Sequence, residues 1–327
     1  MFSKLLILSL ILSFSSAFAS AKDPISAKIK KYSVFTGLCN QNYVSLRKFK
    51  KNDTNYFLAV NTETLQTKIF PEKSLKCVPM DFPEIKVKLK SSAYIKAILE
   101  FETNKGATQD AGITHFLGNQ RGINLTVDLC PSSKPLDRIL FDSLLKSFGT
   151  DEKAVPVAIS ITGNWLIKHK ADIDWLVDLE NKSLLKITWV NHSYSHRFSK
   201  ELPLESNFLL KKGTDVKYEV LQNEKLMIER GLLPSIFFRF PGLVSNSQDF
   251  SKINSFGLLV IGTDAWLAKN EWPKNGSIVL VHANGNELIG VKRFLKLLAK
   301  EKNNIVKKKW VLYDLTDSLK EEAAKKP

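Results

Sequence analysis

Short apolar segments alternate with amphipathic segments from Gly122 to Tyr313, and this alternation is the strongest constraint on the fold. The apolar segments are almost continuously hydrophobic, which is typical of parallel strands buried on both faces. We predict strands at 123–128, 155–161, 186–190, 235–240, 258–261, 277–281 and 309–313, separated by helices at 136–148, 172–180, 215–230 and 287–300. About seven such strand–helix units predict an α/β fold, either a parallel barrel or a doubly wound sheet.

The region before Gly122 has a different pattern. Polar and apolar residues alternate in three segments, which predicts short antiparallel strands at 43–50, 56–60 and 65–70. A helix is predicted at 91–102 from the spacing of its apolar residues. We therefore predict a small β-rich accessory domain at 22–118, followed by the α/β domain at 119–327.

The N-terminus, residues 1–21, has the pattern of a signal peptide. Lys4 precedes an apolar run at 5–14, and Ala17-Phe18-Ala19 resembles a cleavage site. The alternative is an uncleaved membrane anchor, although the apolar run is short for a spanning helix. We expect an exported protein, periplasmic or secreted. Cys39 and Cys77 fit an oxidising compartment because they can form a disulfide, although free thiols also fit the sequence.

The chain is basic, with 48 Lys and Arg residues against 33 Asp and Glu residues and a formal net charge of +15. A basic exported protein can be attracted to anionic envelope polymers or to lipid headgroups, which suggests peripheral contact with the envelope surface. The lysines are spread along the chain and form no dense block, so we predict no nucleic-acid partner. The basic composition can also reflect only an AT-rich genome.

Reactive side chains follow five of the predicted strands. Asp128, His192, Arg239, Asp264 and His282 each lie at or just after the C-terminal end of a different strand. Because the C-terminal ends of parallel strands meet on one face of a barrel, we expect these side chains to form one site.

A histidine pair is the most distinctive part of this set. His192 and His196 are four residues apart, so in a helical or turn-like backbone both rings can reach one metal ion. The same spacing also occurs by chance in histidines that bind no metal. The pair follows the predicted strand 186–190, which places it where sites in α/β folds are built.

The reactive residues lie in five short motifs, which are, in order, Thr126-Val-Asp128, His192-Ser-Tyr-Ser-His196, Arg239-Phe-Pro241-Gly242, Asp264-Ala-Trp266 and Leu280-Val-His282. Taken in this order, they resemble the motifs of the polysaccharide deacetylases, the NodB-homology group also called carbohydrate esterase family four. The resemblance spans about residues 122–313. It implies a distorted (β/α) barrel, a divalent metal that is often zinc, and removal of acetyl groups from acetylated sugars.

The resemblance also implies a role for each residue. Asp128 is similar to the general base and His282 to the acid that protonates the leaving amine. Arg239 resembles the arginine that orients the base, and Asp264 the acid that pairs with the catalytic histidine and raises its pKa. A metal held by His192 and His196 would lower the pKa of water and polarise the carbonyl. The residues expected to contact substrate are Trp266, Pro241 and Asn284; for Asn284 the alternative is a simple turn that contains a helix cap.

The first motif departs from the family pattern. The family usually has two adjacent carboxylates there, a base and then a metal ligand, whereas this chain has Leu129 followed by Cys130. The Asp-Leu-Cys sequence is identified with a divergent subfamily. Asp128 itself can serve as the third metal ligand, or Asp137, Cys130 or water can supply it. The remaining alternative is weak metal binding in a relative that does not hydrolyse its ligand.

Three functions are consistent with these features. The first is a metal-dependent deacetylase that acts on N-acetylated sugars of an envelope polysaccharide, peptidoglycan or glycolipid. The second is a non-catalytic carbohydrate-binding relative of the deacetylases, which the change at Leu129 favours. The third is binding of an anionic polymer through surface lysines, which would weaken steeply with salt and would not need His192.

We expect the purified mature chain to contain about one equivalent of zinc or a similar divalent ion. The double variant His192→Ala, His196→Ala should lose it, because both imidazole ligands are removed. Elemental analysis of the two proteins checks this. Absence of metal from both, even after soaking with zinc, would contradict a metal-dependent hydrolase.

Overall fold

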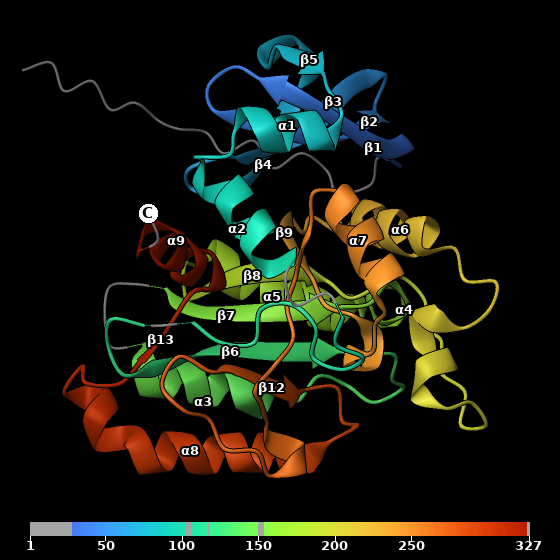
Figure 1. Ribbon diagram of the computed structural model, residues 1–327. Helices are drawn as coiled ribbons and strands as arrows, with labels where there is room; N and C mark the ends of the chain where they lie inside the picture. The colour runs from blue at the N-terminus through green and yellow to red at the C-terminus, as the bar shows by residue number, and fades with distance from the viewer. Residues whose placement is uncertain (1–27, 103–105, 117, 150–153, 326–327) are drawn as a thin grey trace, which may run out of the picture.

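The computed structural model describes residues 28–102, 106–116, 118–149 and 154–325, so the predicted signal peptide lies outside the described residues. Two sheets build the protein. The larger is a parallel sheet with strand order β10-β9-β8-β7-β6-β12-β11, and β13 pairs with β6 off this path. The smaller is antiparallel, with order β4-β3-β2-β1-β5. Figure 1 shows the smaller sheet above the larger one, with α8 and α3 on the opposite side.

The larger sheet confirms the prediction of an α/β fold with a distorted (β/α) barrel. Its strands are β6 (Gly122–Leu129), β7 (Val155–Ile161), β8 (Leu185–Asn191), β9 (Pro234–Phe238), β10 (Leu259–Val260), β11 (Ala265–Trp266), β12 (Ile278–His282) and β13 (Val311–Leu312). Every residue of β6 is buried, as its continuous apolar pattern predicts. The two-residue strand β11 was not predicted from the sequence, because two residues carry no periodicity.

Helices follow most strands of the larger sheet, and α9 follows its last strand, β13. They are α3 (Arg138–Phe148), α4 (Gly163–Lys168), α5 (Lys170–Asn181), α6 (Val216–Glu229), α7 (Ser247–Ser255), α8 (Leu288–Val306) and α9 (Leu315–Lys325). The Asp215 side chain caps α6 by accepting from the backbone N–H of Tyr218 at 3.1 Å. Two residues after α6 ends, Gly231 has a φ of 80°, which is the left-handed conformation typical of a helix C-terminus.

The N-terminal region confirms a small β-rich part before the barrel. Its elements are β1 (Lys30–Cys39), β2 (Tyr43–Lys51), β3 (Thr54–Asn61), β4 (Thr67–Pro71), β5 (Cys77–Pro79), α1 (Phe82–Lys88) and α2 (Ala93–Phe101). A disulfide joins Cys39 to Cys77 and so links β1 to β5. Helix α1 was not predicted from the sequence, and it contains Pro83 in its first turn. Proline is tolerated in the first turn of a helix, where its missing N–H has no partner to lose.

The N-terminal region packs closely on the barrel. Val44 and Leu46 of β2 share one hydrophobic cluster with Val190 of β8 and Phe237 of β9. Ile113 forms a parallel bridge to Ile261 beyond β10. The boundary between residues 118 and 119 remains a prediction. No described helix is long and apolar enough to cross a membrane.

A buried ion pair fixes the two parts relative to each other. Arg47 of β2 donates to both carboxylate oxygens of Glu224 of α6, at 2.7 and 2.9 Å. The Tyr32 hydroxyl also donates to Glu224, at 3.0 Å. The Arg47 and Glu224 side chains are almost completely buried, at 0% and 1% exposure. Water cannot reach either charge, so each charge is neutralised by the other.

We expect Arg47→Met to lower the free energy of unfolding by about 3–5 kcal/mol, because it leaves the Glu224 carboxylate buried without a counter-charge. Replacing both residues, Arg47→Met with Glu224→Leu, should recover most of that loss. Urea denaturation followed by circular dichroism checks both. As a control, Lys170→Met breaks an exposed ion pair with Asp174 and should change stability by less than about 0.5 kcal/mol. An Arg47→Met protein as stable as the wild type would contradict the argument.

Candidate functional site

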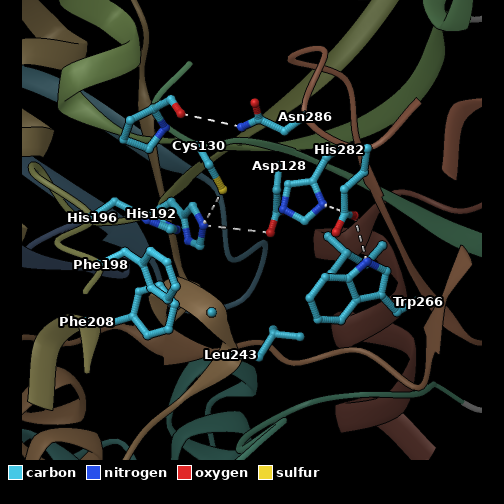
Figure 2. A pocket seen from close by; sticks show the side chains of 14 residues that line it. Asp128, Cys130, His192, His196, Phe198, Phe208, Leu243, Trp266, His282 and Asn286 are labelled. Carbon is cyan, nitrogen blue, oxygen red and sulfur yellow. Dashed lines mark hydrogen bonds and ion pairs between the residues drawn. The ribbon is translucent and has the colours of Figure 1, made fainter. Parts of the chain in front are cut away.

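A pocket of about 370 Å³ lies where β6, β8, β9 and β12 end. Its lining residues are Asp128, Cys130, Pro131, His192, His196, Phe198, Phe208, Gly242, Leu243, Trp266, Leu280, His282, Asn286 and Glu287. Figure 2 shows His192 and His196 on one side, His282 and Trp266 on the other, and Asp128 between them. The predicted site residues Asp128, His192, His196, Trp266 and His282 therefore do come together.

Asp128 is held in place by Arg239. The guanidinium group of Arg239 is fully buried and donates to Asp128 Oδ1 and to Thr126 Oγ1, both at 2.7 Å. Burial by itself would raise the pKa of the Asp128 carboxyl, but the charges of Arg239, His192 and His282 outweigh it and lower this pKa. Asp128 is therefore an anion whose other oxygen, Oδ2, lies 3.7 Å from His192 Nε2.

The two histidines of the predicted metal site lie in the loop after β8. His192 is buried, and its Nδ1 lies 2.9 Å from the carbonyl oxygen of Arg239. This contact orients the ring so that Nε2 faces Cys130 and Asp128. The loop turns sharply rather than forming a helix, because Ser193 and His196 have left-handed backbones with φ of 66° and 49°. The two imidazole centroids lie 5.0 Å apart.

Neighbouring side chains fix this loop. Asn191 accepts from the backbone N–H of Ser193 at 3.0 Å and from the Asn223 side chain at 2.8 Å. Glu219 of α6 accepts from the Ser195 backbone N–H at 2.7 Å and from its hydroxyl at 2.6 Å. Because hydrogen bonds satisfy both ends of the turn, the positions of the histidine rings are set before any ligand binds.

Cys130 completes a candidate group of metal ligands. Its Sγ lies 3.5 Å from His192 Nε2. Within the part of the chain that the structure describes, Cys130, His192 and His196 form a group whose ligand atoms all lie within 4.8 Å of one another. Asp128, which was predicted as a third ligand, is not part of that group. Asp137, another candidate, instead accepts from the backbone N–H of Gly285 at 2.8 Å.

The chemistry of this group fits a divalent metal. Two imidazole nitrogens and a thiolate are donors that zinc prefers. His196 Nε2 is buried and has no hydrogen-bond partner in the part of the chain that the structure describes, an arrangement that costs free energy unless something binds the nitrogen. Burial alone would raise the pKa of the Cys130 thiol, but His196, His282 and His192 outweigh it, so this pKa lies well below its ordinary value.

His282 ends β12, directly beside Asp128 in the register of β12 with β6. Its Nδ1 lies 2.7 Å from Glu287 Oε2, and the same oxygen accepts from Trp266 Nε1 at 2.9 Å. Burial would lower the pKa of His282, but Cys130, Glu287 and Asp128 outweigh it and raise this pKa well above its ordinary value. Glu287 has a lowered pKa, because the His282 charge and hydrogen bond outweigh burial. Glu287 therefore orients His282 and stabilises its charged form.

Asp264 does not take the predicted place beside His282, and this is a correction. It lies between β10 and β11, where its Oδ2 is 2.8 Å from His115 Nδ1 and accepts from Ser277 Oγ at 3.2 Å. The Asp264 backbone N–H donates to the carbonyl oxygen of Ile278, the first residue of β12, whereas His282 is the last residue of that strand. Four residues of strand correspond to about 13 Å, too far for a hydrogen bond.

The other two predicted substrate contacts also differ from expectation. Asn284 is fully buried, and its amide donates to the Cys130 carbonyl oxygen at 2.8 Å, so it supports the strand end rather than lining the pocket. The turn that contains it exposes Asn286 to the pocket instead. Pro241 is buried at the start of a 3-10 turn, Pro241–Leu243, and the two residues after it line the pocket.

Aromatic and apolar side chains form the remaining wall. Phe198 packs on Phe208 with ring centroids 5.4 Å apart, and Phe208 lies 5.3 Å from the His196 ring. Gly242 has a φ of 63°, and a Cβ there would approach the Phe208 ring to 2.3 Å. Only glycine therefore fits at this position without displacing the wall.

The most important residue missed at the sequence level is Glu287. The motifs directed attention to Asp264, and Glu287 matched no motif. The only available signal was a carboxylate at the start of a predicted helix five residues after His282. Because that helix follows a turn, the spacing alone does not show that the carboxylate folds back onto the histidine.

Comparisons with known proteins give distant similarities. No known family model matches the sequence. A family 4 carbohydrate esterase from Bacillus anthracis is 18% identical, with 67% of this chain and 89% of that chain covered and a TM-score of 0.46. Bacillus subtilis PdaA, also a family 4 carbohydrate esterase, is 15% identical, with 69% and 89% covered and a TM-score of 0.48. A CE4 family pseudoenzyme from Bacillus anthracis is 14% identical, with 63% and 68% covered and a TM-score of 0.44.

We expect Glu287→Gln to lower the pKa of His282 in the metal-free protein, because a neutral amide stabilises the imidazolium less than a carboxylate does. Nitrogen-15 NMR of the histidine side chains against pH measures this. Asp264→Asn is the matched control and should leave the His282 titration unchanged, since Asp264 bonds to His115. A His282 titration that responds to Asp264→Asn but not to Glu287→Gln would contradict the assignment.

Proposed function

We propose that this chain is a metal-dependent hydrolase that removes acetyl groups from N-acetylated sugars of an envelope polysaccharide, peptidoglycan or glycolipid. One observation carries the proposal. A buried carboxylate, Asp128, and a histidine, His282, lie side by side in one pocket with a group of three metal-ligand side chains. Amide hydrolysis needs such a set: a base for water, an acid for the leaving amine and stabilisation of the oxyanion.

A metal would be held by His192 and His196, with Cys130 or Asp128 as a third protein ligand. When bound, zinc or a similar ion would polarise the acetyl carbonyl and make a water molecule more acidic. The fit of the donors supports this, as does the unpartnered His196 Nε2. Zinc is proposed because imidazole and thiolate suit it.

The chain's own groups would move the protons. Asp128 takes a proton from the attacking water, and Arg239 keeps the carboxylate oriented because it bonds the opposite oxygen. His282 gives its Nε2 proton to the amide nitrogen as the carbon–nitrogen bond breaks, which yields a free amine and acetate. Glu287 holds Nδ1, so Nε2 is the nitrogen available for the transfer.

Sugar binding would use the aromatic walls. Trp266 lies beside His282 with ring centroids 5.7 Å apart, and Phe198 is 56% exposed on the opposite side. Flat aromatic faces suit the apolar C–H faces of a sugar ring, while Asn286 offers a polar contact near the reacting group. Export to the periplasm or the cell exterior, inferred from the N-terminal sequence, would place the protein with envelope polymers.

A non-catalytic carbohydrate-binding protein is the second candidate. The observation that favours it is Leu129, which is fully buried in the core and supplies no ligand where the deacetylase pattern has a carboxylate. The presence of Cys130 in the pocket weakens this alternative, because a thiolate can supply the missing donor.

The test is acetate release by the zinc-loaded protein from chitin oligomers and from peptidoglycan fragments. We expect turnover by the wild type, and a loss of about 10²–10⁴-fold in kcat for Asp128→Asn and for His282→Asn, since each removes one proton-transfer group. His115→Asn is the matched control, because this histidine lies outside the pocket, and it should keep the wild-type kcat.

Two outcomes would overturn the proposal. A zinc-loaded wild type that binds the oligomers without releasing acetate, with binding unaffected by His282→Asn, would identify the carbohydrate-binding alternative. If binding of the oligomers disappears at high salt and is unchanged in His192→Ala, the function is instead that of a polymer-binding surface.

A further inference from the structure

The end of β6 places two reactive side chains on one side of the strand. Successive side chains of an extended chain point to opposite faces, so Asp128 of β6 and Cys130, the first residue after β6, share a face and Leu129 points the other way. Leu129 packs in the barrel's main hydrophobic cluster, whereas Asp128 and Cys130 both line the pocket. The side chain of residue 130 therefore points into the pocket and can reach a metal there. The side chain of residue 129 points into the core and cannot.

The separation of Cys130 from His192 matches that of two ligands on one ion. A tetrahedral zinc site has bonds of about 2.3 Å to sulfur and about 2.0–2.1 Å to nitrogen, which puts the two donors about 3.6 Å apart. Cys130 Sγ and His192 Nε2 lie 3.5 Å apart. Cys130 also stays in place without a metal, because Asn284 donates to its carbonyl oxygen.

The contacts of the two histidines indicate which ring nitrogens can face a metal. His192 Nδ1 is engaged by the Arg239 carbonyl oxygen, so its Nε2 faces Cys130, and His196 Nε2 is buried without a hydrogen-bond partner among the described residues. Asp128, in contrast, already has a partner of opposite charge, because Arg239 bonds it at 2.7 Å. Its carboxylate would have to share its charge between Arg239 and the ion if it were also a ligand.

We propose that Cys130 is the third protein ligand of the metal, so that the centre is His192, His196 and Cys130, and Asp128 remains free as the base. This inference rests on the metal site of the proposed function and assigns its ligands. A thiolate carries the same charge as the missing carboxylate but is a softer donor. The centre should therefore prefer zinc or cobalt to magnesium or manganese.

Cobalt titration of the chelator-stripped full chain tests the assignment. A cobalt–thiolate bond gives a near-ultraviolet charge-transfer band that imidazole and carboxylate ligands do not give. We expect this band to saturate at about one equivalent in the wild type and to be absent in Cys130→Ser. Competition with a zinc indicator should show zinc affinity weakened more than about 100-fold in Cys130→Ser, since even supporting residues typically change metal affinity 10–100-fold.

Two further variants complete the comparison. Cys130→Asp restores the negative charge without sulfur and should bind cobalt without the band. Asp128→Asn should keep the band, with an affinity within about tenfold of the wild type. Circular dichroism of each metal-free variant checks that it is folded. X-ray absorption of the zinc-loaded wild type needs no variant and should show one sulfur at about 2.3 Å.

The outcomes separate this inference from the function it rests on. Metal bound without a sulfur ligand and lost in Asp128→Asn would overturn the assignment of Cys130 and leave the proposed hydrolase intact. No binding of zinc or cobalt by the folded wild type would overturn both. A sulfur ligand in a protein that releases no acetate would support the metal centre and overturn the hydrolase.

Discussion

The site depends on one buried cation. Arg239 lies at the end of β9 with no exposure to water, and its guanidinium neutralises Asp128. Its backbone serves the same site, because its carbonyl oxygen engages His192 Nδ1 and its N–H donates to the Asn191 carbonyl at 2.9 Å. One residue therefore fixes the charge of the proposed base and the orientation of a candidate metal ligand. A buried charge is tolerated only when it is paired in this way.

A second ion pair lies on the opposite side of the pocket, and there an anion stabilises a cationic side chain. His282 carries the positive charge and Glu287 the negative one, and Trp266 holds the second donor bond to the same carboxylate oxygen. One member of each ion pair, Asp128 of β6 and His282 of β12, lies at the same register position on adjacent strands. The surroundings thus lower the pKa of the Asp128 carboxyl and raise that of the His282 imidazole, and such a difference in environment gives two titratable groups different roles.

Much of the barrel could be predicted from the sequence, because buried parallel strands leave a continuous apolar pattern. β7 begins and ends where its pattern does, and Asp128, His192 and His282 were placed at strand ends from that pattern alone. The prediction failed where the chain between β10 and β12 contains only the two-residue strand β11. The number of residues there does not reveal that Asp264 stays level with the start of β12.

The sequence by itself determined the alternation of strands and helices and the basic charge of the chain. It also supplied a carboxylate, three histidines and a thiol near strand ends. These are local properties that periodicity and residue type carry. Only the tertiary structure decided which carboxylate reaches His282 and which donors converge near His192. Those choices depend on turns and on the relative height of neighbouring strands. Contacts between residues such as Arg239 and Asp128, 111 positions apart, leave no periodic pattern in either segment.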